Sequence, residues 1–434
     1  MSIPVVTVGS AQEAVVGGLE RLHGPVTVVR RCSELAELIA ACQSGLAVAA
    51  VISEGCEELT TTMVDRLGAV GVSIIALTDD PAEAKRLLAI GAMPAVTGIE
   101  ATDLAAKISE AVGRGSRTTF ARDTGFSDPG ADLRLMPVTD SADEEVPKGE
   151  GQVIAVWGPI GAPGRTVLAV NIAAELAAEG KSVILVDADT YGASVSAMLG
   201  LLDESAGLAQ ACRLADQGLL DVEALREVAI PVFTNGGVLR VLTGTTRADR
   251  WIELRAGAVS MVLEAARQLA DLVVVDAGFC LESDEELSFD TLAPRRNAAT
   301  LRSLEMADVV FAVGAADAIG VPRLVRGLAE LEAALPDVAP RVVLNKVKRS
   351  AVGHSPRQQL DDAWGRYGPG VGVDAYLPAD AAACDAALLA GSVLLEIAPD
   401  SALRAAIAAL VCAPVQQNRH SFGRTIRALH LLKR

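Results

Sequence analysis

A glycine-rich turn between two apolar runs carries residue types that bind phosphate. Its key residues are Gly158, Gly161, Gly164, Arg165 and Thr166. Backbone N–H groups at a helix start can cradle phosphate oxygens, and a hydroxyl at the end of such a loop can bind Mg²⁺. A lysine normally precedes that hydroxyl, and this chain has an arginine there. The turn predicts nucleotide binding and leaves turnover of the nucleotide open.

Three aspartates follow predicted strands and could complete this site. Asp187 and Asp189 follow the strand that comes after the glycine-rich turn, and Asp276 ends a later strand. Ligands of an open parallel sheet bind at the carboxyl ends of its strands, so the three carboxylates should meet the loop at one edge. We expect Mg²⁺ to be held by the Thr166 hydroxyl and by Asp187 and Asp276, whose carboxylates would bind it directly or through water. We also expect the three aspartates to orient an attacking water molecule. A lone aspartate after a strand is often a turn residue, so the prediction depends on the joint pattern.

This joint pattern resembles the ParA/MinD superfamily of P-loop ATPases, and within it the CpaE/TadZ and septum-site-determining branch of bacteria, especially actinobacteria. The resemblance covers most of 151–412. It implies ATP and Mg²⁺ as cofactors, with Asn345 of the segment VVLNKV contacting adenine and Pro378 lying beside the purine. It also implies a homodimer that forms on nucleotide binding.

The chain departs from that family at the loop. The family has a signature lysine early in the loop, and Ile160 stands at the matching position. Arg165 replaces the second lysine; arginine keeps a charge, but its planar fork differs from a compact ammonium group. Pro159 and Pro163 remove two N–H donors. We expect ATP binding to survive and hydrolysis to be slow or lost, because a missing cation costs transition-state stabilisation.

The strands and helices that must position these residues indicate an α/β fold with two sheets. Residues 4–113 alternate between strands and helices, with strands expected at 5–8, 26–29, 47–52, 73–77 and 94–96. Such alternation is typical of a doubly wound, mostly parallel sheet. The larger part, 151–412, alternates in the same way, with strands expected at 153–156, 183–186, 238–242, 272–275, 309–313, 342–344 and 374–377.

The first part resembles the receiver domain of two-component signalling in order and length, but not in chemistry. A receiver has an acidic pair after its first strand, a phosphoaccepting aspartate after its third and a lysine after its fifth. This chain has Gly9 and Ser10, then Ser53 and Glu54, then Thr97 or Gly98 at those places, and only Thr78 fits. We interpret it as a pseudo-receiver. An unrelated small α/β domain is the alternative.

We therefore expect four parts: a pseudo-receiver at 1–113, a flexible acidic linker at 114–150, a P-loop NTPase domain at 151–412 and a basic amphipathic tail at 413–434. The linker is rich in Gly, Ser, Asp, Thr and Pro and has no hydrophobic period. In the tail, apolar residues fall on one face of a predicted helix over 419–434, with arginines opposite. This pattern is typical of an element that binds a membrane surface or a partner, or packs on its own acidic domain.

Composition limits the partners and the compartment. The formal net charge is −17, which argues against nucleic-acid binding through a broad basic surface. The seven cysteines show no CxxC pair, as expected for a reduced, cytoplasmic protein. No apolar run reaches the roughly 20 residues that span a bilayer. Peripheral attachment at the inner face of the membrane, through the tail, stays open.

Three functions fit these observations. The first is a nucleotide-dependent positioning factor of the ParA/MinD type, acting with a protein partner of the septum or of Flp/Tad pilus assembly. The second is a degenerate, non-hydrolysing scaffold of the same machinery, which Ile160 and Arg165 favour. The third is a chromosome-partitioning ATPase, which the acidic charge disfavours. An iron–sulfur carrier of this family would need a C-terminal CxxC, which the chain does not have.

Overall fold

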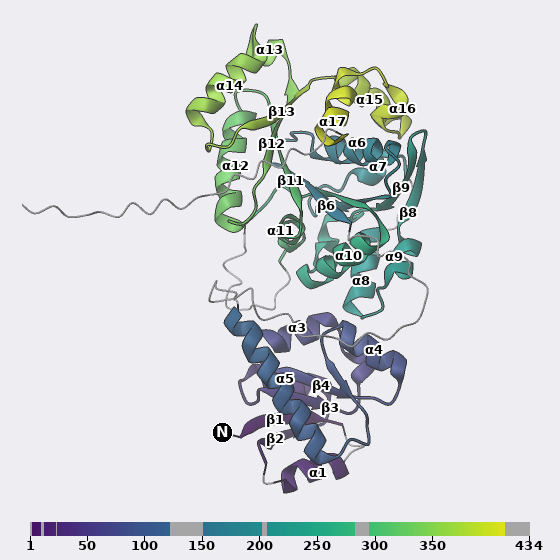
Figure 1. Cartoon of the computed structure of the whole chain (residues 1–434), viewed down its shortest axis with the longest axis vertical. Helices are drawn as coiled ribbons and strands as arrows, with labels where there is room; N and C mark the ends of the chain where they lie inside the picture. Colours follow the sequence, from purple (N-terminus) through teal and green to yellow (C-terminus); the bar gives the residue numbers. More distant parts are fainter. Residues whose placement is uncertain are drawn as a thin grey trace, which may run out of the picture.

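The computed structural model describes residues 2–9, 13–22, 24–121, 151–201, 206–282 and 295–412. Most of the expected linker and the whole of the expected tail lie outside these residues. Figure 1 shows two parts, one below from the N-terminal segment and one above from residue 151 onward. No helix within the described residues is long and apolar enough to span a lipid bilayer.

The N-terminal part is built on a five-stranded sheet. Its strands are β1 (Ile3–Val8), β2 (Val26–Cys32), β3 (Ala49–Ile52), β4 (Ser73–Leu77) and β5 (Met93–Ala95). Its helices are α1 (Glu13–Arg21), α2 (Leu35–Gln43), the short 3₁₀ helix η1 (Cys56–Glu58), α3 (Thr61–Ala69), α4 (Pro81–Ala89) and α5 (Ala101–Ala121). The strands pair in parallel in the order β2-β1-β3-β4-β5, which is the order of receiver-like doubly wound folds.

Alternation along these strands separates two cores. In β1, Val6 and Val8 pack with residues of α2, α3 and α4, whereas Val5 packs with residues of α1 and α5. Side chains of a strand point alternately to the two faces, so each apolar strand can supply both cores. Helix α5 extends to Ala121, so its last residues lie within the linker expected at 114–150.

The second part is built on an eight-stranded sheet. Its strands are β6 (Gln152–Trp157), β7 (Val183–Ala188), β8 (Ile230–Thr234), β9 (Gly237–Leu242), β10 (Leu272–Ala277), β11 (Val309–Ala315), β12 (Arg341–Val347) and β13 (Val373–Pro378). Their order is β13-β12-β11-β6-β10-β7-β9-β8. The helices are α6 (Arg165–Ala178), α7 (Val195–Met198), α8 (Gly207–Asp216), α9 (Val222–Val228), the 3₁₀ helix η2 (Ala248–Glu253), α10 (Ala256–Leu269), α11 (Ala298–Glu305), α12 (Gly320–Ala334), α13 (Arg349–Val352), α14 (Pro356–Tyr367), α15 (Ala381–Ala390), α16 (Leu394–Ile397) and α17 (Ala402–Cys412).

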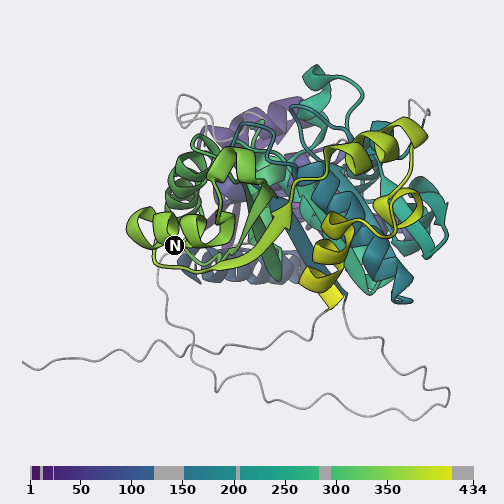
Figure 2. The same cartoon turned by 90° about the horizontal axis from the view of Figure 1, so that it is seen from above.

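Helices cover both faces of this sheet. On one face, Ile154 and Val156 of β6 belong to a core with residues of α6, α15 and α17. On the other, Val153 packs with α8 and α10, and Trp157 packs with α12 and α14. Seen from above, the green segment around α12 lies on the left and the yellow helices α15–α17 lie on the right (Figure 2). The predicted α/β fold class, a receiver-like sheet followed by a P-loop parallel sheet, is confirmed.

The larger sheet differs from the expected one at its edge. Strand β8 was not expected, and it pairs antiparallel with β9, so the sheet is not wholly parallel. Asn235 and Gly236 form the two-residue connection between β8 and β9. An Asn-Gly pair between apolar runs is a strong hairpin signal, because both residues tolerate a left-handed backbone.

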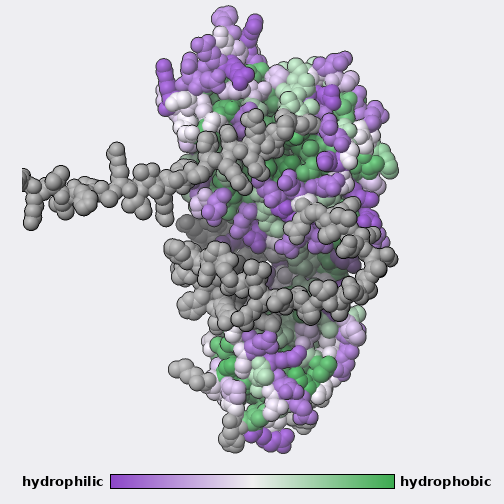
Figure 3. Space-filling model, viewed as in Figure 1, coloured by the Kyte–Doolittle hydropathy of each residue, from purple (hydrophilic) through white to green (hydrophobic). Residues whose placement is uncertain are grey.

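The two parts contact each other through α3 and α8. The buried Thr61 hydroxyl donates to the Ala215 carbonyl at 3.1 Å, and the Thr62 N–H donates to a carboxylate oxygen of Asp216 at 2.9 Å. Arg86 of α4 adds a hydrogen bond to the Gln217 carbonyl at 3.0 Å. In Figure 1, α3 and α4 accordingly lie just below α8 and α10. Figure 3 shows hydrophilic and hydrophobic residues interspersed on the visible face of both parts.

Candidate nucleotide site

The loop between β6 and α6 is folded tightly, and its glycines explain how. Gly161 and Gly164 have φ values of +123° and +98°, in the region that glycine adopts without a steric penalty. A Cβ on Gly158 would lie 2.2 Å from the Val313 carbonyl oxygen, so that position also excludes a side chain. Ala162 has φ +51° although it carries a Cβ, which is a strained conformation. The loop thus curls at the start of α6, where N–H groups can meet an anion.

Asp187 and Asp276 lie side by side at the carboxyl ends of β7 and β10. The two residues are register partners in the parallel pairing of these strands, and both are fully buried. Asp187 accepts hydrogen bonds from the N–H groups of Ser194 and Val195 at 2.9 and 3.0 Å. Neither carboxylate oxygen of Asp276 has a hydrogen bond of normal geometry in the described structure, although the Thr166 hydroxyl lies close enough to lower the pKa of this group.

Burial changes the acidity of this pair. It raises the pKa of Asp187 to about 6, although backbone hydrogen bonds act in the opposite direction. Burial also raises the pKa of Asp276 well above its ordinary value, and the charge of Asp187 adds to the effect. Two neighbouring carboxyl groups that are both buried resist ionising together, so one of them tends to keep its proton unless a cation binds between them.

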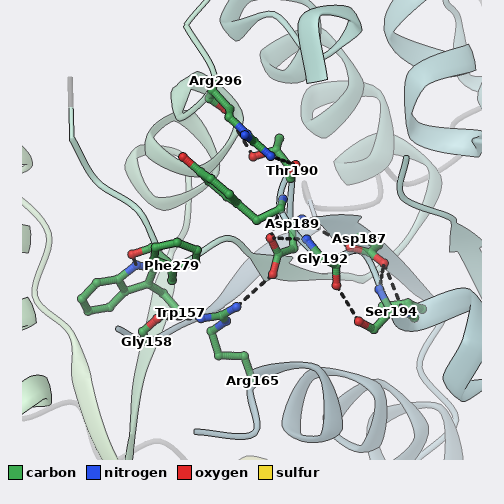
Figure 4. A network of polar contacts seen from close by, with 12 residues as sticks. Trp157, Gly158, Arg165, Asp187, Asp189, Thr190, Gly192, Ser194, Phe279 and Arg296 are labelled. Atoms are coloured by element: carbon green, nitrogen blue, oxygen red, sulfur yellow. Dashed lines mark hydrogen bonds and ion pairs between the residues drawn. The ribbon is translucent and has the colours of Figure 1, made fainter. Parts of the chain in front are cut away.

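Arg165 is engaged by the site itself. Its guanidinium forms an ion pair with Asp189 at 2.9 Å, and it donates to the Gly158 carbonyl at 2.9 Å (Figure 4). The second oxygen of Asp189 accepts from the N–H groups of Tyr191 and Gly192 at 2.9 and 3.2 Å. Both side chains of the pair are largely buried. Arg165 therefore bridges the start of the loop and the Asp189 turn.

The end of β12 supports the loop from its other side. Asn345 donates through Nδ2 to the Pro163 carbonyl at 2.8 Å and accepts from the Lys346 N–H at 2.8 Å. The Lys346 ammonium donates to the Ala162 carbonyl at 2.7 Å. Lys346 has φ +60°, and within the described residues it and Ala162 are the two non-glycine residues with positive φ. The two strained residues therefore contact each other at the loop.

A cavity of about 730 Å³ opens over these groups. The predicted residues that line it are Gly161, Gly164, Arg165, Thr166, Asp189, Asn345 and Pro378. Gly158, Asp187 and Asp276 are not among its lining residues, and both carboxylates are fully buried at the ends of β7 and β10. The described structure thus brings the predicted loop, carboxylates and β12–β13 residues to one edge of the sheet.

Sequence reasoning missed an aromatic wall of this cavity. Tyr191 and Phe279 line it, with ring centroids 4.7 Å apart, and the Arg296 guanidinium lies 3.8 Å from the Tyr191 ring centroid. The Tyr191 hydroxyl is hydrogen-bonded to the Asn297 side chain at 2.9 Å. Tyr191 follows Asp189 and Phe279 follows Asp276 by two or three residues, and this closeness in sequence could have indicated that both rings lie at the site. The two rings give the wall a rigid, apolar surface.

The donor set suits magnesium rather than a metal held by protein alone. No group of three or more His, Cys, Asp or Glu side chains that could hold a metal exists among the described residues. Mg²⁺ is commonly bound by one or two carboxylates together with substrate phosphates and water. The carboxylate of Asp276 and the neighbouring Thr166 hydroxyl fit that mode, so these residues could hold Mg²⁺ brought in with a nucleotide.

The family model of ParA, described as an NUBPL iron-transfer P-loop NTPase, matches residues 150–230. The match contains the phosphate loop and the turn with Asp187 and Asp189. It supports the ParA/MinD superfamily of P-loop NTPases. No match was found among curated proteins.

Several solved structures are similar to part of this chain at low sequence identity. A ParA family ATPase from Chlorobium tepidum is 20% identical, with 61% of this chain and 99% of that chain covered and a TM-score of 0.50. MinD from Pyrococcus horikoshii with Mg-ADP is 18% identical, with 60% and 94% covered and a TM-score of 0.45. A Cyanothece McdA–ATP complex is 14% identical, with 60% and 95% covered and a TM-score of 0.45. At these identities the likeness concerns the fold alone.

The loop residues that depart from the resembled family differ in their exposure. The Ile160 side chain, at the position of the signature lysine, is 60% exposed. Pro163 is buried, and its carbonyl accepts a hydrogen bond from the Asn345 side chain. In the N-terminal part, the Ser53 hydroxyl donates to the Val8 carbonyl, and the Thr97 N–H donates to the Asp79 carboxylate.

Proposed function

We propose that this chain is a nucleotide-dependent positioning factor of the ParA/MinD type that binds ATP with Mg²⁺. The observation that carries the proposal is the buried pair Asp187 and Asp276 beside the phosphate loop. Two neighbouring buried carboxylates, one without a hydrogen bond of normal geometry, are costly to ionise unless a cation neutralises them. A magnesium nucleotide supplies that cation and the phosphate that the loop can cradle.

Calorimetric titration with ATP and Mg²⁺ tests this proposal. We expect micromolar binding to the full chain and its loss in a variant that combines Asp187→Ala with Thr166→Ala. Thermal unfolding of the variant without nucleotide controls for misfolding. Absence of binding to the natural chain at millimolar ATP would sink the proposal.

Hydrolysis is proposed to be slow, because the loop cation is already committed. Arg165 is paired with Asp189 and held by the Gly158 carbonyl, so phosphate must compete with these partners. This observation also favours the second candidate, a non-hydrolysing scaffold with the same partners. Single-turnover measurement of phosphate release separates the two: release that depends on Asp189 favours a slow ATPase, and no release over hours favours the scaffold.

The finer role is proposed from the resemblance noted in the sequence. The chain would form a homodimer on binding ATP and act with a protein of the septum or of Flp/Tad pilus assembly, as a CpaE/TadZ-like factor with its pseudo-receiver as a targeting module. Sedimentation with and without a non-hydrolysable ATP analogue tests the dimer; an unchanged monomer would contradict it. The expected membrane-binding tail lies outside the described residues, and co-sedimentation of the full chain and a 1–415 truncation with liposomes tests it.

Two other functions receive less support. The matched family model is described as an iron-transfer NTPase, but the described residues hold no cysteine cluster, and the chain has no CxxC. DNA partitioning would need clustered lysines and arginines, whereas the net charge is −17.

A further inference from the structure

A second cavity lies on the other flank of the phosphate loop. Its volume is about 370 Å³, and it lies between the loop and the segment that leads into α12. Ile160, Gly161 and Pro163 line both this cavity and the larger one, so the two meet at this part of the loop. The second cavity is mostly apolar, but it contains the guanidinium of Arg323 from α12.

Arg323 lies directly against the loop backbone. Its Nη1 atom would be only 2.6 Å from a Cβ built on Gly161, so the absence of a side chain at 161 makes room for the guanidinium. Arg323 is half-buried, yet its side chain has no hydrogen bond or ion pair to any described residue. The Asp317 carboxylate, which lines the same cavity, accepts instead from the N–H groups of Ile319 and Gly320 at 2.9 and 2.7 Å.

An arginine in this position lacks an anion. A half-buried guanidinium that lines an open cavity is available to an anion, and arginine binds phosphate oxygens through a fork of parallel N–H groups. The loop arginine cannot easily take this role, because Arg165 is held by Asp189 and the Gly158 carbonyl. Lys346 is likewise engaged by the Ala162 carbonyl. Lys348, which also lines the larger cavity, is exposed, so Arg323 is the half-buried cation of the described loop environment that has no protein partner.

We propose that Arg323 binds an oxygen of the terminal phosphate of a nucleoside triphosphate held by the loop of the same chain. The inference rests on the proposed nucleotide binding and adds the residue that distinguishes a triphosphate from a diphosphate. Contact with Gly161 favours phosphate over a carboxylate of a protein partner, because the guanidinium touches the loop that would hold the phosphate chain. An arginine supplied by the same chain can also stabilise charge on a transferring phosphoryl group.

Calorimetric titration with Mg²⁺ and either ADP or a non-hydrolysable ATP analogue tests the assignment. In Arg323→Ala, we expect affinity for the triphosphate to fall about tenfold or more, as for loss of a hydrogen bond to a charged group, with ADP affinity changed less than about twofold. Arg323→Lys keeps a charge and should recover part of the triphosphate affinity. Arg326→Ala is the matched control, since this arginine lies on the same helix, is exposed and lines neither cavity.

The outcomes separate this inference from the function on which it rests. If the natural chain binds neither nucleotide, the proposed nucleotide function fails and the assignment falls with it. If the natural chain binds both, and Arg323→Ala weakens both equally or neither, only the role of Arg323 is overturned. The assignment would also be overturned if a peptide with a free carboxylate bound the natural chain more tightly than the triphosphate did and lost its affinity in Arg323→Ala. Arg323 would then bind a protein partner. Thermal unfolding of each variant confirms that the folded state is retained.

Discussion

At the scale of residues, the buried carboxyl group of Asp276 should lower the stability of the folded protein when it is ionised, although the proposed Mg²⁺ site needs its charge. It is fully buried next to Asp187, and its pKa is raised by burial and by the Asp187 charge. A carboxyl group with a raised pKa in the folded state contributes stability that is fully present below its unfolded pKa of about 4, and this stability is lost as pH rises through the folded pKa. The protein without nucleotide should therefore lose stability as pH rises across neutrality.

Asp276→Asn should make the nucleotide-free protein more stable at high pH. The neutral amide removes the cost of ionising this buried site, so we expect a gain on the order of 1–3 kcal/mol at about pH 8 that shrinks toward about pH 5. Urea unfolding at the two pH values measures it. The same variant should lose Mg²⁺-dependent ATP binding, because a neutral amide is a weaker ligand for a hard cation.

An exposed carboxylate on α12 provides the matched control. Glu330 lies on the surface, and Glu330→Gln should leave the pH dependence of unfolding unchanged. If Asp276→Asn shows the same pH dependence as the natural chain, Asp276 does not carry a raised pKa. The carboxylate pair would then need a different explanation.

At the scale of elements, β12 acts as a support for the phosphate loop. Asn345→Ala removes the hydrogen bond to the Pro163 carbonyl and leaves that buried group unpaired. We expect the free energy of unfolding to fall by about 1–2 kcal/mol and nucleotide affinity to fall with it, since the loop is less well ordered before binding. Chemical denaturation and calorimetric titration measure the two effects.

A second substitution at the same position separates the two bonds of Asn345. Asn345→Asp retains an acceptor for the Lys346 N–H but has no donor for the Pro163 carbonyl. It should impair stability and binding at least as much as Asn345→Ala. Natural stability and affinity in Asn345→Asp would show that the contact with Pro163 does not matter.

The elements also show what the sequence could and could not predict. Apolar strand runs with Asp187 and Asp276 at their ends predicted the shared sheet edge, because parallel strands align their carboxyl ends. The antiparallel strand β8 had a usable signal in Asn235-Gly236 that the prediction overlooked. The contacts of Lys346 with Ala162 and of Arg323 with Gly161 join residues far apart in sequence, and no local spacing rule encodes them.

At the scale of the whole molecule, the N-terminal part is attached to the larger part, residues 151–412, through helix ends. The first N–H groups of a helix have no intrahelical partner. In α3, the Thr62 N–H and hydroxyl both donate to the Asp216 carboxylate at the end of α8. The same helix α8 packs through Leu208 and Ala211 on the core under β7 and β10, the strands that end in Asp187 and Asp276. The interface and the site thus share one packed layer.

Asp216→Ala should loosen this attachment without unfolding either part. The carboxylate caps α3 from the other part of the chain, and its loss leaves the Thr62 N–H without that partner, at a cost of about 1–3 kcal/mol to the contact. Hydrogen–deuterium exchange should speed up at the start of α3 and the end of α8, while β7 and β10 stay protected. Asp221→Ala is the control, because Asp221 caps α9 by accepting from the Ala224 N–H within its own part, so that substitution should affect α9 and leave α3 protected. Unchanged exchange at α3 in Asp216→Ala would mean that Thr61, Arg86 and apolar packing hold the two parts together without this cap.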